Sequence, residues 1–357
     1  MQSLTTKRYG KTMADILSIK QGFFDNDVYK HKETRASDIY RKQPLRIKCK
    51  VCQSPITKGI YFSNHGTDYT QCEICGHING VYDDSDGFSD DLYSSGNLVH
   101  DYFEETEEQY TRRLDSIYIP KARFLKDMLD AHNADSKSFK YLDVGAGSGY
   151  MVGALDRVGL DAKGIEVDKI QAEFANKMLN NNRIEAHELT EINQLIRTTE
   201  ADVLVFINVW EHVANLTEML SAIQYNVNVK YVFFCVPLIS LSCAIEVAFP
   251  DVFPRHLGGG GRGHTHQFSK SSLAWMYKIY DIAPVAEWYF GTDIMDLFRS
   301  IDVLLRRNNS SEDFVKFISR FFVENADTLQ LCVDKSGFAS DIHVLAKTNS
   351  KQNEGFL

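Results

Sequence analysis

The sequence lacks a surplus of positive charge. Its 357 residues include 39 lysines and arginines against 48 aspartates and glutamates, a formal net charge of −9. Nucleic acids and anionic membranes attract clustered cations, so this balance argues against either as a partner of the whole molecule. The charge is uneven, since residues 30–50 are basic and residues 83–108 are acidic. Two solvated surfaces of opposite sign are the simplest interpretation of that asymmetry.

The sequence also lacks a long apolar run and a basic, apolar leader. Its most apolar window, residues 231–249, contains Pro237 and Glu246, whereas a membrane-spanning helix needs about 20 consecutive, predominantly apolar residues. We interpret this window as a core strand followed by a loop or a short helix. Without a leader, we expect a cytoplasmic protein with no membrane attachment. The composition, 44% hydrophobic and 24% charged, fits one large α/β domain with a smaller attachment.

Cysteine is scarce, but four of the seven cysteines form two close pairs. Cys49 and Cys52 make one Cys-x-x-Cys pair, and Cys72 and Cys75 make another after nineteen residues. This spacing is typical of a four-thiolate zinc site, and the alternative, two disulfides, is disfavoured inside a cell. Four thiolates complete a tetrahedral ion, so we expect a structural zinc. His77, beside the second pair, would then be an ordinary surface histidine.

The most informative stretch is residues 140–150, KYLDVGAGSGY. An apolar run ends near Asp143, three glycines alternate with small residues, and an amphipathic segment follows, which predicts a strand, a tight turn and a helix. A dinucleotide would bind such a turn through its pyrophosphate, with Gly-x-Gly-x-x-Gly spacing. Here the spacing is Gly-x-Gly-x-Gly, and the carboxylate of Asp143 disfavours an anion but suits an ammonium group. S-adenosylmethionine carries such a group.

A second carboxylate follows 21 residues after Gly145, where another apolar run closes on Glu166. Its oxygens could accept hydrogen bonds from ribose hydroxyls. Predicted strands and helices alternate as far as Pro237, which indicates a mostly parallel sheet covered by helices, with ligands beyond the carboxyl ends of its strands. The cofactor-binding residues predicted at these ends are Asp143, Gly145, Ala146, Gly147, Gly149, Glu166, Val167 and Asn208.

Residues 136 to about 347 resemble a class I S-adenosylmethionine-dependent methyltransferase. Besides the two segments above, Ala201–Val213 is similar to the family's fourth strand and to the Glu-His pair often found beyond it, here Glu211 and His212. The resemblance implies a Rossmann-like α/β fold whose last strand is antiparallel, and Ile282–Phe290 with Asp341–Lys347 could form the terminal antiparallel pair.

In related enzymes, a segment before the first strand covers the cofactor. Tyr102, Tyr110, Arg112 and Arg113 are therefore candidates for a lid, with an arginine able to bind the methionine carboxylate. Aromatic residues that only pack a helix against the core are the alternative.

Methyl transfer requires a positioned acceptor and often a base, and histidine is the natural base near neutral pH. His212, His264 and His266 are the candidate bases, with His212 and His266 ranked slightly ahead. Glu211 would contact cofactor or substrate, or orient a histidine. Hydrogen-bonded histidines with no catalytic role are the alternative for each.

The four-cysteine ribbon, the Glu-His pair and the His-x-His-x-Phe-Ser segment at 264–269 are together similar to nucleotide-sugar C-methyltransferases. That resemblance implies a small-molecule substrate, a ketosugar on a nucleotide diphosphate, and a base that removes a carbon-bound proton. O-methylation of a sugar or another metabolite fits the same residues. Two functions of a different class compete with it: an RNA methyltransferase that uses the basic residues 30–50, and a non-catalytic scaffold.

We predict four regions along the chain. They are an irregular arm at 1–46, a zinc ribbon at 47–98, a helical linker or lid at 99–135, and a catalytic domain at 136–350. The catalytic domain includes a helical insertion near 293–332, which would serve as a cap or an oligomer surface.

Overall fold

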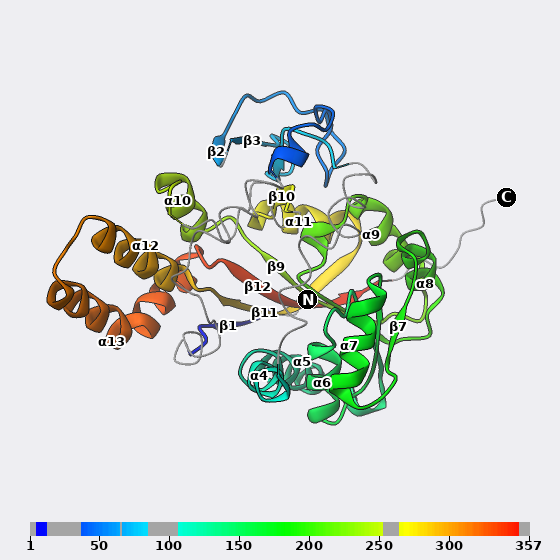
Figure 1. The fold of residues 1–357 in the computed structure, drawn as a ribbon. Coiled ribbons are helices and arrows are strands. Elements are labelled where there is room, and N and C mark those ends of the chain that lie inside the picture. The colour runs from blue at the N-terminus through cyan, green and yellow to red at the C-terminus, as the bar shows by residue number, and fades with distance from the viewer. Residues whose placement is uncertain (1–4, 13–36, 65, 85–105, 253–263, 350–357) are drawn as a thin grey trace.

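The computed structural model describes residues 5–12, 37–64, 66–84, 106–252 and 264–349. Within these ranges, an eight-stranded sheet runs through the middle of the molecule in the order β1-β11-β12-β9-β8-β5-β6-β7 (Figure 1). Its strands are β1 (Thr6–Tyr9), β5 (Lys140–Val144), β6 (Asp161–Glu166), β7 (Ile184–Ala186), β8 (Val203–Ile207), β9 (Tyr231–Pro237), β11 (Ile282–Phe290) and β12 (Asp341–Thr348).

The strand directions confirm the predicted Rossmann-like fold. Strands β5 to β9 run parallel to one another, and β12 lies antiparallel between β9 and β11. The carboxyl ends of the parallel strands therefore share one edge, where ligands of such sheets bind. The edge strand β1 was not predicted. It pairs parallel to β11 within the segment expected to be an irregular arm.

Helices cover both faces of the sheet because its parallel strands are apolar on both sides. Along β8, Val203 and Val205 pack against one helical layer, whereas Leu204 and Phe206 pack against the other. The first layer contains α5 (Ile119–Ala131), α6 (Tyr150–Arg157) and α7 (Lys169–Leu179), and the second contains α8 (Ile192–Thr198), α9 (Leu216–Tyr225) and α11 (Lys270–Ile279). The two layers lie on opposite sides of the sheet in Figure 1.

A second sheet contains the predicted ribbon. Its order is β10-β4-β3-β2, and every pairing is antiparallel. Three strands come from the predicted ribbon, β2 (Phe62–Asn64), β3 (Thr67–Gln71) and β4 (Ile78–Gly80), but β10 (His266–Gln267) comes from the C-terminal half of the chain. The predicted ribbon is thus joined to the larger part of the chain by backbone hydrogen bonds and not only by a linker.

The predicted helical insertion is a pair of helices, α12 (Asp293–Arg307) and α13 (Glu312–Ser336), at one side of the sheet (Figure 1). Phe298 and Phe322 stack between them at 5.2 Å. The carboxylate of Asp293 fixes the start of α12, because it accepts hydrogen bonds from Ser242, Gln330 and Ser340. A role for this helix pair as a cap or an oligomer surface stays a prediction.

The apolar window at 231–249 is β9 followed by the short helix α10 (Leu241–Ala248), as expected. None of the helices that the structure describes has the length and apolar character that crossing a membrane requires.

Candidate functional site

The glycine turn follows β5 and requires its glycines. Gly145, Gly147 and Gly149 have φ angles of 72°, 54° and 76°, in the left-handed region that other residues rarely adopt. A Cβ on Gly145 would lie 2.9 Å from a methyl group of Val209, so space also excludes a larger residue. The N–H groups of Gly145 and Ala146 both donate to the Ile165 carbonyl, which holds the turn against β6.

Asp143 lies at the carboxyl end of β5, directly before this turn. Its side chain is 2% exposed, and its Oδ1 atom has no hydrogen-bond partner among the described residues. Burial, followed by the nearby charge of Glu166, raises the pKa of Asp143 well above the ordinary aspartate value. An ionised carboxylate is costly in these surroundings unless a cation approaches it. The site therefore suits a positively charged ligand group.

Glu166 ends β6 and is also buried, but it has several partners. Its Oε2 accepts the N–H of Gly147 at 2.7 Å, and its Oε1 accepts those of Val167 and Asp168 at 2.8 and 3.1 Å. A carboxylate offers about four acceptor positions, so about one remains for a ribose hydroxyl. Val167, next to it, is a half-exposed apolar side chain.

A layer of tyrosines covers the glycine turn. Tyr110, on α4 (Glu107–Arg113), is buried and donates a hydrogen bond from its hydroxyl to the carbonyl of Ser148 at 3.0 Å. Its ring stacks on Tyr150 at 4.4 Å, and Tyr150 stacks on Tyr118 at 4.9 Å. Tyr110 thus lies where a lid residue would, whereas Tyr102 lies outside the described residues. The two lid arginines differ, since the Arg113 guanidinium lies 5.6 Å from the Tyr150 ring and Arg112 pairs with Glu108 on the surface.

Lys121 was not predicted from the sequence. It lies in the first turn of α5 and is buried, with its ammonium 5.1 Å from the Tyr118 ring. Burial raises the pKa of both Asp143 and Glu211, and the positive charge of Lys121 opposes that rise at each of them. The sequence offered one indication of its position. Pro120 is typical of the start of a helix, which places Lys121 in the first helical turn.

Beyond β8, the predicted Asn208 and Glu211 contact each other. The Asn208 side-chain amide donates to Glu211 Oε1 at 3.0 Å. Glu211 is fully buried, and its second oxygen, Oε2, has no hydrogen-bond partner in the described part of the chain. Burial raises the pKa of Glu211 to about 8.

Three of the four predicted catalytic residues lie together. The rings of His212 and His264 are 4.5 Å apart, and one atom each of Glu211, His212 and His264 lies within 4.8 Å of the others. His266 faces the ribbon instead, with its Nδ1 atom 2.8 Å from Nε2 of His77. The expectation that His77 is a surface histidine is wrong, because its side chain is fully buried in this contact.

The four paired cysteines converge on one point. The Sγ atoms of Cys49 and Cys75 are 3.6 Å apart, those of Cys52 and Cys72 are 3.4 Å apart, and all four lie within 4.8 Å of one another. None of them is in a disulfide. A tetrahedral zinc with bonds of about 2.3 Å would separate its sulfurs by about 3.8 Å, so the cluster has the donors and nearly the dimensions that the ion requires.

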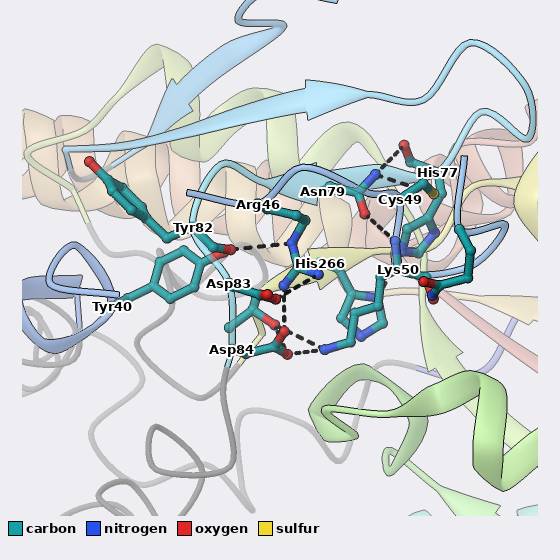
Figure 2. A network of polar contacts seen from close by, with 12 residues as sticks. Tyr40, Arg46, Cys49, Lys50, His77, Asn79, Tyr82, Asp83, Asp84 and His266 are labelled. Carbon is teal, nitrogen blue, oxygen red and sulfur yellow. Dashed lines mark hydrogen bonds and ion pairs between the residues drawn. The ribbon is translucent and has the colours of Figure 1, made fainter. Parts of the chain in front are cut away.

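A buried ionic network connects this cluster to the histidine segment (Figure 2). Asp84 accepts hydrogen bonds from the side chains of Arg46, Lys50 and Thr265, the last at 2.6 Å. Lys50 directly follows Cys49, and Thr265 lies between His264 and His266. The ribbon therefore positions the segment that carries His264.

Comparison with known proteins places the chain among methyltransferases. A family model described as a methyltransferase domain matches residues 107–287, and no curated protein matches the chain. A magnesium protoporphyrin IX methyltransferase from Synechocystis PCC 6803, solved with bound S-adenosylhomocysteine, is 9% identical, with a TM-score of 0.45 over 73% of this chain and 97% of that one. A geranyl diphosphate C-methyltransferase from Streptomyces coelicolor A3(2) is 14% identical, with a TM-score of 0.37 over 71% and 89%. Residues 107–287, which the family model matches, include the glycine turn, the carboxylates of Asp143 and Glu166, and the group of Glu211, His212 and His264.

Proposed function

We propose that this chain, which belongs to the methyltransferase-domain family and is an S-adenosylmethionine-dependent methyltransferase, methylates a sugar or a nucleotide-linked sugar at oxygen or carbon. The binding part of this proposal is carried by Asp143 beside the glycine turn, whose buried Oδ1 has no partner among the residues described. A dinucleotide would bring phosphate charge to this carboxylate, whereas the methionine end of S-adenosylmethionine brings an ammonium group.

In this proposal, three charged side chains hold the cofactor. Asp143 accepts a hydrogen bond from the ammonium group, Lys121 binds the carboxylate of the methionine end, and Glu166 binds a ribose hydroxyl with its remaining acceptor position. When bound, the cofactor supplies an activated methyl group on a sulfonium. Tyr110 closes the site over the glycine turn and excludes water.

The Glu211, His212 and His264 group is the place where the acceptor would lose its proton. Its position beyond β8, on the same edge of the sheet as Asp143, supports this role. His266 lies outside this group, with its Nδ1 atom 2.8 Å from Nε2 of His77, so His212 and His264 are the histidines that we place beside the acceptor.

Two features support a sugar acceptor and a structural zinc. The ribbon, the Glu-His pair and the His-x-His-x-Phe-Ser segment occur together, which is the combination that resembles nucleotide-sugar C-methyltransferases. The four convergent cysteines would hold the zinc away from the Glu211 cluster. An RNA substrate is less well supported, because two cations of the basic segment, Arg46 and Lys50, are buried in ion pairs with Asp84.

The test is methyl transfer from labelled S-adenosylmethionine to a panel of free sugars, nucleotide sugars and RNA oligonucleotides. We expect label in one or more sugars and none in RNA. Label in RNA alone would replace the proposed substrate class. A folded chain that binds no S-adenosylhomocysteine would contradict the proposed cofactor site itself.

A further inference from the structure

Glu211, His212 and His264 form a group of metal-ligand type that is separate from the four cysteines. One ligand atom of each lies within 4.8 Å of the other two. Glu211 and His212 come from the short turn after β8, while His264 comes from the segment before β10. The fold therefore brings His264 to Glu211 and His212, although His264 lies more than fifty residues later in the chain.

The ligand chemistry and the spacing both suit a divalent transition-metal ion. Two imidazoles and one carboxylate are a common set for such ions, whereas thiolate clusters select zinc and all-oxygen sites select magnesium or calcium. An ion with bonds of about 2.1 Å holds its ligand atoms about 3 to 4 Å apart. Small side-chain rotations would bring the three atoms to those distances.

The two oxygens of the Glu211 carboxylate differ in their hydrogen bonding. Its Oε1 is fixed by the hydrogen bond from Asn208, and its Oε2, fully buried, has no hydrogen-bond partner in the described ranges. A desolvated oxygen without a partner is costly, and a cation would offset that cost. Partners that hold the other atom of a ligand are a regular feature of metal sites. Lys121 acts against a cation here, and we expect its charge to be neutralised by the cofactor carboxylate.

We propose that Glu211, His212 and His264 bind a divalent first-row cation that holds the methyl acceptor, and that the acceptor carries two adjacent oxygens. This inference rests on the proposed function. Three protein ligands leave up to three positions of an octahedral ion for a chelating pair of oxygens, which sugars offer. The cation lowers the pKa of the bound hydroxyl, whose proton passes to solvent. The oxygen then forms a bond to the methyl carbon as the sulfur–methyl bond breaks, leaving a neutral thioether.

Manganese is a suitable probe because it prefers nitrogen and oxygen ligands and competes poorly for thiolates. Mn²⁺ binding to the full-length, zinc-loaded chain would be measured by electron paramagnetic resonance and calorimetry, with saturating S-adenosylhomocysteine. We expect one Mn²⁺ site, weakened at least tenfold in Glu211→Gln and in His264→Ala. His187→Ala is the matched control, since His187 also lies beside two glutamates but is half-buried directly after β7, and it should not change the affinity.

The zinc content of each variant reports whether the ribbon and its contacts remain folded. The proposal is wrong if the zinc-loaded wild type binds no Mn²⁺, if Glu211→Gln and His264→Ala bind it as tightly as the wild type, or if His187→Ala removes the site. The titration with S-adenosylhomocysteine tests the proposed function separately, because Asp143 and Glu166 lie outside the metal group. Loss of cofactor binding with Mn²⁺ binding intact would contradict the proposed function and leave the metal site standing.

Discussion

Replacing Asp143 by asparagine should weaken S-adenosylhomocysteine binding and abolish a proton release that accompanies it. In the free chain, burial and the charge of Glu166 raise the pKa of Asp143, so this carboxyl keeps its proton to a higher pH than an ordinary aspartate does. An ammonium group beside Oδ1 favours the ionised form and lowers that pKa. Ligand binding therefore releases a proton to the buffer. Asparagine keeps the shape of the side chain but has no proton to release.

The loss of affinity follows from the burial of the ion pair between the Asp143 carboxylate and the ammonium group of the ligand. Removing one partner of a buried, hydrogen-bonded charge pair costs roughly 2 to 4 kcal/mol of binding free energy. Since about 1.4 kcal/mol corresponds to a factor of ten, the dissociation constant should rise roughly 30- to 700-fold. The proton count should lie between zero and one and should decrease as the pH rises, because more of the free Asp143 is then ionised.

The assay is isothermal titration calorimetry in buffers of different ionisation enthalpy, where the slope of the observed enthalpy gives the number of protons released. Asp161→Asn is the control, because Asp161 is exposed at the opposite end of the neighbouring strand β6. An asparagine variant at 143 that binds with wild-type affinity would refute the cofactor orientation. A buffer-independent enthalpy in the wild type would refute the protonation argument.

Three further predictions concern the ribbon and the helix pair. Asp84→Asn leaves Lys50 buried without its counter-charge and should lower the free energy of unfolding by roughly 3 to 5 kcal/mol in urea denaturation, with partial recovery in Lys50→Met/Asp84→Asn; an unchanged midpoint would count against the network. Cys49→Ser should lose zinc, by elemental analysis, and reduce turnover with at most a small change in S-adenosylhomocysteine affinity, because β10 pairs with the ribbon strand β4; full activity without zinc would contradict this. Burial raises the pKa of Asp334 from 3.8 to about 7, so this group favours folding below pH 4 and loses that contribution as pH rises to 7. The free energy of unfolding of Asp334→Asn, relative to that of the wild type, should therefore be higher at pH 8 than at pH 5. An equal difference at the two pH values would refute the raised pKa of Asp334.

The elements that depend on local pattern could be predicted from the sequence. The family resemblance implied the terminal antiparallel pair, which the structure places at Ile282–Phe290 and Asp341–Thr348. The alternation of predicted strands and helices indicated the parallel sheet from β5 to β9. Glycine spacing indicated the turn after β5, because only glycine tolerates its backbone angles. These features depend on residues close together in the chain.

The features that depend on distant contacts could not be predicted. His77 and His266 are 189 residues apart, and nothing local to either indicates that they meet. Lys121 is a polar residue on a helix with several exposed neighbours, and its burial follows only from how α5 packs over the sheet. The strand β1 is four residues long with exposed side chains, so it has no alternating pattern, and it forms because β11 offers an unpaired edge.

The four-stranded sheet that β10 shares with the ribbon cannot be completed until late in synthesis of the chain. The ribbon obtains its fourth strand from residues that follow His77 by 189 positions. At translation rates of about 5–20 residues per second, roughly 10 to 40 seconds separate the emergence of β4 from that of β10. During that interval the nascent chain presents an open strand edge and, in Lys50, a cation whose partner Thr265 has not been made. Until β10 is made, the open edge of β4 can pair with the wrong strand.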